Sequence, residues 1–423
     1  MEFSTFGRKL TCDAGILSLM EDLGRAKEKY GDDLVMMGGG NPGQIAEFQE
    51  LMRGHLSEIC SDPAEFGELV GSYSPPYGNR EFVTSLSSLF TGEFGWNVGP
   101  DNICLTNGSQ TGFFMLFNLL AGKMSDGSVK KICLPMAPEY IGYADLGLEQ
   151  DLFVSNRPNI EIIDDWFFKY RVDFENLHID HTIGAICISR PTNPTGNVID
   201  DNEMQKLMAR AERCNIPIII DSAYGAPFPG MIYTEATPVW NENLILSLSL
   251  SKLGLPAVRT GIVIASKEII AALTAMNAIM SLSPTNFGAH LANRLVADGT
   301  IIEVSKSVMQ PFYRSKMKKA VAAVKENFGD LPCRMHVPEG AMFLWLWFEG
   351  LPITSLELYQ RLKEEGALVV SGHYFFPGLV EEWPHKDQCL RVTYSQDDGD
   401  VQKGLRIIAE TVRRVYAEEK KDD

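Results

Sequence analysis

Short apolar runs that alternate with helix-like stretches fill residues 101–265 and constrain the fold more than any other feature. The candidate strands of this region are Ile103–Thr106, Lys131–Leu134, Ile183–Ser189, Ile216–Asp221, Leu244–Leu250 and Gly261–Ala265. Between them, Gly112–Leu120 is apolar on all sides, which indicates a buried helix, and Asp200–Cys214 is amphipathic. This alternation predicts an α/β fold with a sheet built largely from βα units.

The character of the sequence changes after about residue 300. The elements predicted there are a charged helix over Gln310–Asn327, a strand over Ala341–Phe348, a helix near Leu356–Glu365, strands near Leu368–Ser371 and Cys389–Tyr394, and a final charged helix. Because 423 residues are too many for one ordinary core, we expect two domains. The larger would span residues 61–300 and the smaller, of α+β type, residues 301–423, with residues 1–60 packing on the smaller one.

Charge and cysteine usage exclude several classes of protein. A formal net charge of −17 argues against a nucleic-acid partner, which requires a basic surface. The cysteines are scattered without a CxxC pair: Cys12, Cys60, Cys104, Cys133, Cys187, Cys214, Cys333 and Cys389. Such spacing is typical of reduced, buried thiols. The first ten residues lack the apolar stretch of a signal peptide, and Met342–Phe348 is too short to cross a bilayer, so we expect a cytoplasmic protein without a membrane partner.

Ligands of a doubly wound sheet lie beyond the carboxyl ends of its strands, so residues that bind a ligand are expected directly after each strand. Ile103–Thr106 is followed by Asn107-Gly108-Ser109-Gln110 and then by the buried helix. The free N–H groups at this helix start could bind a phosphate. A plain capped helix start explains the turn equally well.

Two further loops carry an aromatic ring and a fixed amide. Tyr140 comes soon after the strand Lys131–Leu134 and could stack on a planar cofactor, although loop packing is the commoner role. Asn193 lies between Pro191 and Pro194, which hold its backbone extended. Because a rigid turn does not require asparagine there, the functional interpretation is favoured.

Asp221 ends an apolar strand, and Tyr224 follows three positions later. A buried carboxylate is costly unless it meets a cation, and a pyridinium N–H would be such a partner. The alternative is an aspartate that caps the next turn.

Lys252 follows the strand Leu244–Leu250, with Ser249 and Ser251 beside it and Arg259 after it. The amine could form a Schiff base with an aldehyde, and the hydroxyl groups and the arginine could bind a phosphate carried by that aldehyde. Pyridoxal phosphate is an aldehyde of this kind. Taken by itself, this motif is explained equally well by a surface lysine after an ordinary strand. All the strand ends together favour the cofactor, because they supply an amine, an acid, an aromatic face and a phosphate cup.

These motifs resemble the fold-type I aminotransferases that depend on pyridoxal 5′-phosphate. The resemblance rests on NPTG at 193–196, Asp221 with Tyr224, SxSK ending at Lys252, Arg259, and LRVTY around Arg391, and it runs nearly end to end. It implies a mainly parallel seven-stranded sheet in the large domain beside the smaller α+β domain. It also implies ping-pong transfer of an amino group between amino and 2-oxo acids, in a homodimer.

The resemblance also implies a role for each residue. Lys252 would bind the aldehyde and move the proton, Asp221 would keep the ring nitrogen protonated, and Asn193 and Tyr224 would hydrogen-bond the phenolic oxygen. Tyr140 would stack on the ring. The phosphate would be held by Gly108, Ser109, Gln110, Ser249, Ser251 and Arg259.

The substrate side of the site follows in the same way. Arg391 would bind the α-carboxylate in a bidentate fork that lysine cannot match, with Asn193 and Gly40 close to the substrate. Tyr73, in YSPPYG, resembles the tyrosine that reaches the phosphate of the neighbouring subunit.

The sequence also bears on four alternative functions. A lyase or synthase on the same fold stays open, because the same electron sink serves either outcome. A regulator would need a basic helix-turn-helix extension, which the sequence lacks. The GxGxxG match at 38–43 contains Pro42 inside the turn, which argues against a dinucleotide site. His178 and His181 lie in polar, loop-like sequence, so we expect no metal.

Overall fold

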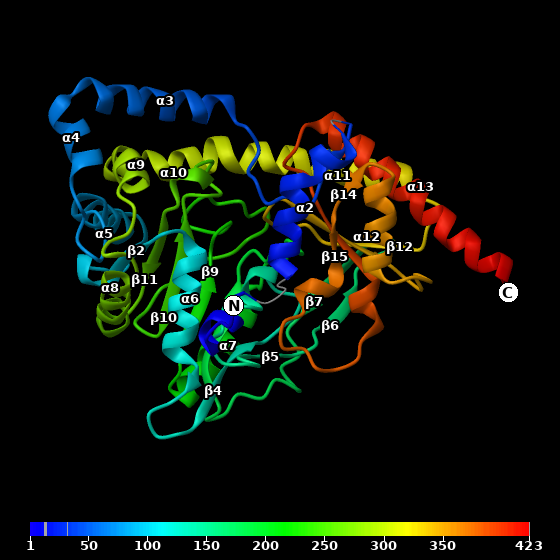
Figure 1. Ribbon diagram of the computed structural model, residues 1–423, viewed down its shortest axis with the longest axis horizontal. Helices are drawn as coiled ribbons and strands as arrows, with labels where there is room; N and C mark the ends of the chain where they lie inside the picture. Colours follow the sequence, from blue (N-terminus) through cyan, green and yellow to red (C-terminus); the bar gives the residue numbers. More distant parts are fainter. Residues whose placement is uncertain (12–14, 32, 423) are drawn as a thin grey trace.

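The computed structural model describes residues 1–11, 15–31 and 33–422 (Figure 1); Cys12 lies outside them. Its larger sheet has eight strands in the order β2-β11-β10-β9-β8-β4-β3, with β5 paired to β4. These strands are β2 (Ile103–Thr106), β3 (Gly122–Lys123), β4 (Val129–Leu134), β5 (Phe153–Ser155), β8 (Ile183–Ser189), β9 (Ile218–Asp221), β10 (Leu244–Ser249) and β11 (Gly261–Ile264).

The sheet is mainly parallel, as the sequence predicted. β5, β4, β8, β9 and β10 run parallel, whereas β11 is antiparallel to both of its neighbours, β10 and β2. The α/β class is therefore confirmed. Eight strands are present instead of seven because the two-residue β3 folds back antiparallel on β4.

Helices cover both faces of this sheet, since alternate side chains of each strand point to opposite sides. On one face Cys104, Ile219 and Val263 share a core with Phe113 and Phe117 of α6 (Ser109–Leu120). On the other, Leu105, Ile220 and Leu246 share a core with helices on the opposite side. The helices that complete the layers are α5 (Arg80–Phe94), α7 (Asp201–Cys214), α8 (Lys267–Ser281), α9 (Phe287–Ala297) and α10 (Thr300–Val304).

A second sheet has six strands in the order β15-β16-β13-β12-β7-β6. They are β6 (Asn159–Ile162), β7 (Phe167–Arg171), β12 (Cys333–His336), β13 (Phe343–Phe348), β15 (Val370–Ser371) and β16 (Cys389–Thr393). Its helices are α11 (Gln310–Asn327), α12 (Ser355–Glu364) and α13 (Asp398–Asp422). Since β7 pairs with β12, this sheet takes strands from both sides of the expected boundary at residue 300.

The N-terminal residues join neither of the two larger sheets, and their described strand belongs to a separate two-stranded sheet. β1 (Val35–Met36) pairs with β14 (Ala367–Leu368), so the strand predicted over Leu368–Ser371 is in fact two short ones in different sheets. By contrast, α3 (Ala46–Ser61) packs against α9 and α4 (Pro63–Gly71). Figure 1 shows α3 beside α9, away from α12 and α13. The exact domain boundaries stay a prediction.

The first two helices are α1 (Thr5–Lys9) and α2 (Gly15–Tyr30). Within the described residues, no helix is long and apolar enough to cross a membrane.

Candidate active site

Lys252 lies just beyond the end of β10, half-buried beside the segment that precedes α3. Its Nζ donates a 2.7 Å hydrogen bond to the carbonyl oxygen of Gly40 and lies 5.4 Å from the ring centre of Tyr224. Burial, and next the nearby Arg391, lower the pKa of this amine to about 8. A neutral amine is therefore present at a pH where an ordinary lysine is almost wholly protonated.

Asp221 is the last residue of β9 and is buried. Its Oδ2 accepts a 2.7 Å hydrogen bond from the Tyr143 hydroxyl, and its Oδ1 accepts one of 2.9 Å from the N–H of Ala223. Burial raises the pKa of this carboxyl, while the Tyr143 bond acts in the opposite direction. The carboxylate thus caps its own turn, as the alternative interpretation of the sequence expected, and its role towards a ring nitrogen stays a prediction.

The turn after β2 is shaped for an anion. Gly108 has φ +84°, and a Cβ on it would lie 2.1 Å from Nη2 of Arg259. Only glycine can therefore bring this backbone so close to the guanidinium. The N-terminus of the twelve-residue α6 begins at once with Ser109, so free N–H groups and a cation meet here.

The other predicted phosphate ligands lie around this turn. The Ser109 hydroxyl donates to the Leu248 carbonyl at 3.2 Å, which ties the start of α6 to β10. The N–H of Ser251 donates to Oγ of Ser249 at 3.1 Å. Gln110 instead donates its amide to the Gly142 carbonyl at 2.8 Å.

Arg391, on β16, is 3% exposed. Its Nη1 donates to Oδ1 of Asn193 at 2.8 Å and its Nη2 donates to the Gly38 carbonyl at 2.6 Å. Its Nε is buried and has no hydrogen-bond partner among the described residues. Burial lowers its pKa to about 10, so the guanidinium keeps its charge at neutral pH. A buried cation with a spare donor fits a carboxylate ligand.

Two predicted tyrosines lie in this region: Tyr224 is beside Lys252, and Tyr140 interacts electrostatically with Arg391, Asp221 and Arg259. Tyr140 is half-buried, and its ring meets that of Tyr143 edge-on with centroids 5.3 Å apart. Tyr224 is buried against Phe343 at 5.7 Å, and burial raises the pKa of its hydroxyl well above the ordinary value.

Tyr73 stands apart from this group. Its side chain is 86% exposed in the single chain. The role predicted for Tyr73 in the site of a neighbouring subunit stays a prediction.

The structure adds residues to the site that the sequence did not single out. Tyr143 binds Asp221, the Gly38 carbonyl binds Arg391, and the buried Glu139 accepts hydrogen bonds from Ser189. Glu139 directly precedes Tyr140, the residue predicted to stack on the ring. An acid inside an otherwise apolar strand-end loop was the one available signal, and its partners depend on the fold.

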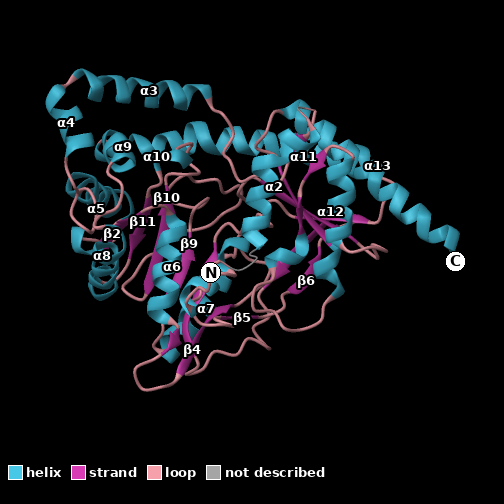
Figure 2. Cartoon of the chain, in the orientation of Figure 1, coloured by secondary structure: helices cyan, strands magenta, loops and turns pink. Residues whose placement is uncertain are grey.

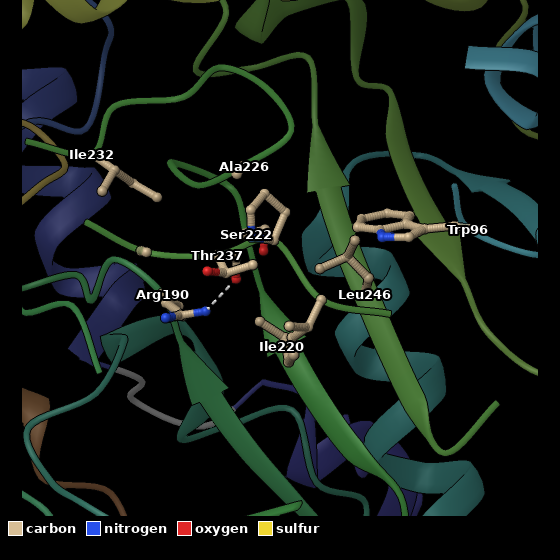
Figure 3. A pocket seen from close by; sticks show the side chains of 11 residues that line it. Trp96, Arg190, Ile220, Ser222, Ala226, Ile232, Thr237 and Leu246 are labelled. Carbon is tan, nitrogen blue, oxygen red and sulfur yellow. Dashed lines mark hydrogen bonds between the residues drawn. The ribbon is translucent and has the colours of Figure 1, made fainter. Parts of the chain in front are cut away.

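A narrow pocket lies on the side of β9 and β10 that carries Ile220 and Leu246. Figure 3 shows Trp96 at one side of it and Arg190 near Thr237 at the other. Arg190 donates to the Thr237 carbonyl at 2.9 Å and pairs with Asp201, so its charge is already satisfied. This pocket does not include Lys252 or Asp221 and is not part of the candidate site.

Comparison with known proteins identifies a family of aminotransferases. Residues 161–408 match the family model described as aminotransferase class I and II. The chain is 49% identical to the valine–pyruvate aminotransferase of Escherichia coli (strain K12) over 418 residues, which cover 99% of this chain and 100% of that protein.

Two crystal structures agree with this comparison. A putative amino-acid aminotransferase from Psychrobacter arcticum 273-4 has a TM-score of 0.95 and 44% identity, covering 99% of both chains. The valine–pyruvate aminotransferase of Salmonella typhimurium LT2 has a TM-score of 0.88 and 46% identity, covering 96% of this chain and 100% of that one.

Proposed function

The chain belongs to the class I and II aminotransferase family, and from this premise we propose that it transfers the amino group of valine to pyruvate, giving 3-methyl-2-oxobutanoate and alanine. Enzymes of this family use pyridoxal 5′-phosphate, whose ring withdraws electrons from the substrate Cα when the cofactor is bound. The transfer would be ping-pong, because the amino acid donor and the 2-oxo acid acceptor would use the site in turn. The near full-length identity of 49% to a valine–pyruvate aminotransferase carries the proposal.

The residues present fit this cofactor. The turn at Gly108, which a Cβ would block, supplies free N–H groups opposite Arg259 and suits a phosphate. Tyr140 would stack on the ring, and Asn193 and Tyr224 would bind its phenolic oxygen. The phosphate ligands would be Gly108, Ser109, Gln110, Ser249, Ser251 and Arg259.

Asp221 and Lys252 would divide the proton chemistry between them. The Asp221 carboxylate, held by Tyr143 and the N–H of Ala223, would keep the ring nitrogen protonated. Lys252 has a pKa of about 8, so its amine can accept a proton from the substrate Cα and return it near neutral pH. The Gly40 carbonyl, 2.7 Å away, orients this amine.

Arg391 would bind the α-carboxylate of the substrate. Its Nη1 is fixed by Asn193 and its Nε is free to donate. A planar fork held in this way binds a carboxylate in one orientation, which exposes the Cα–H bond to the amine.

Charge in the site supports a small, uncharged side chain on the substrate. The cations that act electrostatically on Lys252 among the described residues are Arg391 and Arg259, and Arg259 lies at the phosphate turn. An acidic substrate would require a further cation, whereas valine, alanine and pyruvate require only Arg391.

We further propose that the enzyme is a homodimer with shared active sites. Exposed apolar side chains support this assembly: Phe66, Val70, Tyr73, Ile279, Met280, Leu282 and Phe287. They belong to α4, α8, α9 and adjoining loops, which Figure 2 shows at one end of the molecule. Ser74 hydrogen-bonds Asn286 at 3.1 Å, so the segments carrying Tyr73 and Phe287 are neighbours. The cytoplasmic location stays a prediction.

Steady-state kinetics with a panel of amino donors tests the substrate. We expect valine, alanine and 2-aminobutyrate all to react, because one methylene is worth only about 1–3 kcal/mol in an apolar pocket. Aspartate, glutamate and aromatic amino acids should be much slower. A preference for glutamate or an aromatic donor over both valine and alanine would overturn the substrate proposal. Release of ammonia from β-substituted amino acids, without amino transfer, would favour a lyase instead.

A further inference from the structure

A chain of buried hydrogen bonds leads away from Asp221 to a second acid, Glu139. The Tyr143 hydroxyl, which donates to Asp221 at 2.7 Å, lies 3.3 Å from Oγ of Ser189. That Oγ lies 2.6 Å from Oε2 of Glu139, while the N–H of Ser189 donates to Oε1 at 2.9 Å. Glu139 is 1% exposed, Ser189 2% and Tyr143 0%, so no link is solvated.

Counting hydrogen atoms along this chain shows which protonation state completes it. The single hydroxyl hydrogen of Tyr143 is used on Asp221. If Glu139 is ionised, the single hydrogen of Ser189 goes to Glu139, and two oxygen atoms face each other at 3.3 Å with no hydrogen between them. If Glu139 carries a proton, it donates to Ser189, Ser189 donates to Tyr143, and every link holds one hydrogen.

Electrostatics favours the same state. Burial, with a contribution from Asp221, raises the pKa of Glu139 to about 8 despite its hydrogen bonds to Ser189 and to the N–H of Tyr140. Asp221 has the Tyr143 hydroxyl, the Ala223 N–H and Lys252 to favour its charged form, whereas Glu139 faces no cation in this network. The remaining titratable groups around the chain are Tyr140 and Cys187, and burial raises the pKa of both. Of the two acids, Asp221 is thus the better placed to stay ionised.

We propose that Glu139 is a neutral, protonated acid that positions the Asp221 carboxylate through Ser189 and Tyr143. Asp221 is then the only charged acid in this series of hydrogen bonds. The inference rests on the proposed role of Asp221 at the ring nitrogen. Glu139 does not reach the cofactor and is a positioning residue. Its proton fixes the direction of every hydrogen bond up to Asp221, so the negative charge stays on the one carboxylate that faces the site.

Infrared difference spectroscopy of the cofactor-free enzyme tests the protonation directly. At pH 7 the spectrum of the wild type minus that of Glu139→Gln should show a protonated-carboxyl stretching band, and this band should fade as the pH rises past about 8. An ionised-carboxylate signal at pH 7 in its place would overturn the proposal. Because no cofactor or substrate is present, this result does not depend on the proposed aminotransfer, whose failure would show separately in the kinetics.

The positioning role is tested by the affinity of the apoenzyme for pyridoxal phosphate. Glutamine copies the protonated acid, since its oxygen can accept from the Ser189 N–H and its amide can donate to Ser189 Oγ. Glu139→Gln should therefore bind the cofactor within about threefold of the wild type, whereas Glu139→Leu and Tyr143→Phe should weaken binding about tenfold or more, the scale of a lost hydrogen bond in a charged network.

A matched control separates this effect from the loss of any phenol hydroxyl that donates a hydrogen bond. Tyr416→Phe on α13 removes a hydroxyl that donates to the Glu349 carbonyl at 2.8 Å, and it should leave cofactor affinity unchanged. Equal weakening by Glu139→Gln and Glu139→Leu would show that the negative charge of Glu139 matters, not its proton, and would overturn the proposal. If Tyr143→Phe binds the cofactor as tightly as Tyr416→Phe, the chain does not position Asp221 and the proposal likewise fails.

Discussion

The Nη1 of Arg391 donates a 2.8 Å hydrogen bond to Oδ1 of Asn193, which joins β16 of the six-stranded sheet to the loop after β8 of the eight-stranded sheet. The residue proposed for the substrate carboxylate and a residue proposed for the cofactor therefore hold each other across the two sheets. Movement of one sheet relative to the other would change the distance between the carboxylate site and Lys252. In the proposed mechanism, this contact would couple substrate binding to the geometry of the proton transfer.

Arg391→Lys should lower kcat/KM for valine by about 10- to 100-fold, because a point charge cannot replace a fork that keeps Asn193 and binds a carboxylate. The loss should appear mainly in KM, as expected for a substrate-binding group. Arg157→Lys, in an exposed pair with Glu381, is the matched control and should have little effect. An Arg391→Lys enzyme with an unchanged KM would rule out the carboxylate role.

Much of the larger sheet could be predicted because its strands are buried on both faces. Every residue of β8, β9, β10 and β11 is buried, so apolar residues dominate these strands, although β10 also contains the buried Ser247. The predicted strand ends fall within two residues of those in the structure, and Lys252 and Asp221 lie where these strands end.

The strands that the sequence did not reveal lack this signal. Three of the four residues of β6 are exposed, and β3 has only two residues. β7 joins its sheet by pairing with β12, a contact between residues about 170 positions apart that no local pattern encodes. For the same reason the partners of Asp221 could not be foreseen. Tyr143 binds Asp221 directly, and Glu139 is linked to Asp221 through Ser189 and Tyr143. Both residues lie in a loop whose path depends on tertiary packing.

Asp221→Asn should reduce kcat by about 10²- to 10³-fold, because a preorganised charge opposite the ring nitrogen is lost. The amide is close in size to the carboxylate, so we expect an unchanged melting temperature of the apoenzyme. Asp201→Asn is the matched control for kcat, since Asp201 accepts a hydrogen bond from the Thr237 hydroxyl and pairs with Arg190 outside the site. Near-normal kcat in Asp221→Asn would contradict the assignment.

Borohydride reduction of the cofactor-loaded enzyme, followed by peptide mapping, should place the pyridoxyl label on Lys252. Lys252→Ala should still bind pyridoxal phosphate through the turn at Gly108 and the guanidinium of Arg259, but turnover should be almost completely lost. Lys169 is the informative competitor, because it too is buried but is paired with Glu339 at 2.5 Å. A label on Lys169 or any other lysine would refute the assignment.

The pKa of Lys252 predicts a specific dependence of apoenzyme stability on pH. This pKa is about 8 in the folded chain, below the ordinary 10.5, so between these values the unfolded chain binds more protons and the free energy of unfolding rises with pH. Below pH 8 both states are protonated and the burial cost is complete. Lys252→Met should therefore be the more stable at pH 7, by at most about 3 kcal/mol, and this advantage should shrink towards pH 10.

Denaturant unfolding of the two apoenzymes at pH 7 and pH 10 measures this difference. Lys267→Met serves as the control, since Lys267 is 69% exposed and only weakly paired with Asp101. If the difference in the free energy of unfolding between the wild type and Lys252→Met were the same at pH 7 and pH 10, the Lys252 amine would not be the cause of that difference.

Mixing two defective variants tests the shared active site. Tyr73→Ala and Lys252→Ala should each be nearly inactive, the first because the exposed Tyr73 is proposed to complete the phosphate site of the neighbouring subunit. In a hybrid dimer one of the two sites receives Tyr73 from one subunit and Lys252 from the other and is intact. Random re-association should therefore restore about a quarter of wild-type activity, since half of the dimers are hybrids with one working site. Native mass spectrometry would verify that hybrids form. Hybrids without recovered activity, or a wild-type enzyme fully active as a monomer, would exclude sites shared through Tyr73.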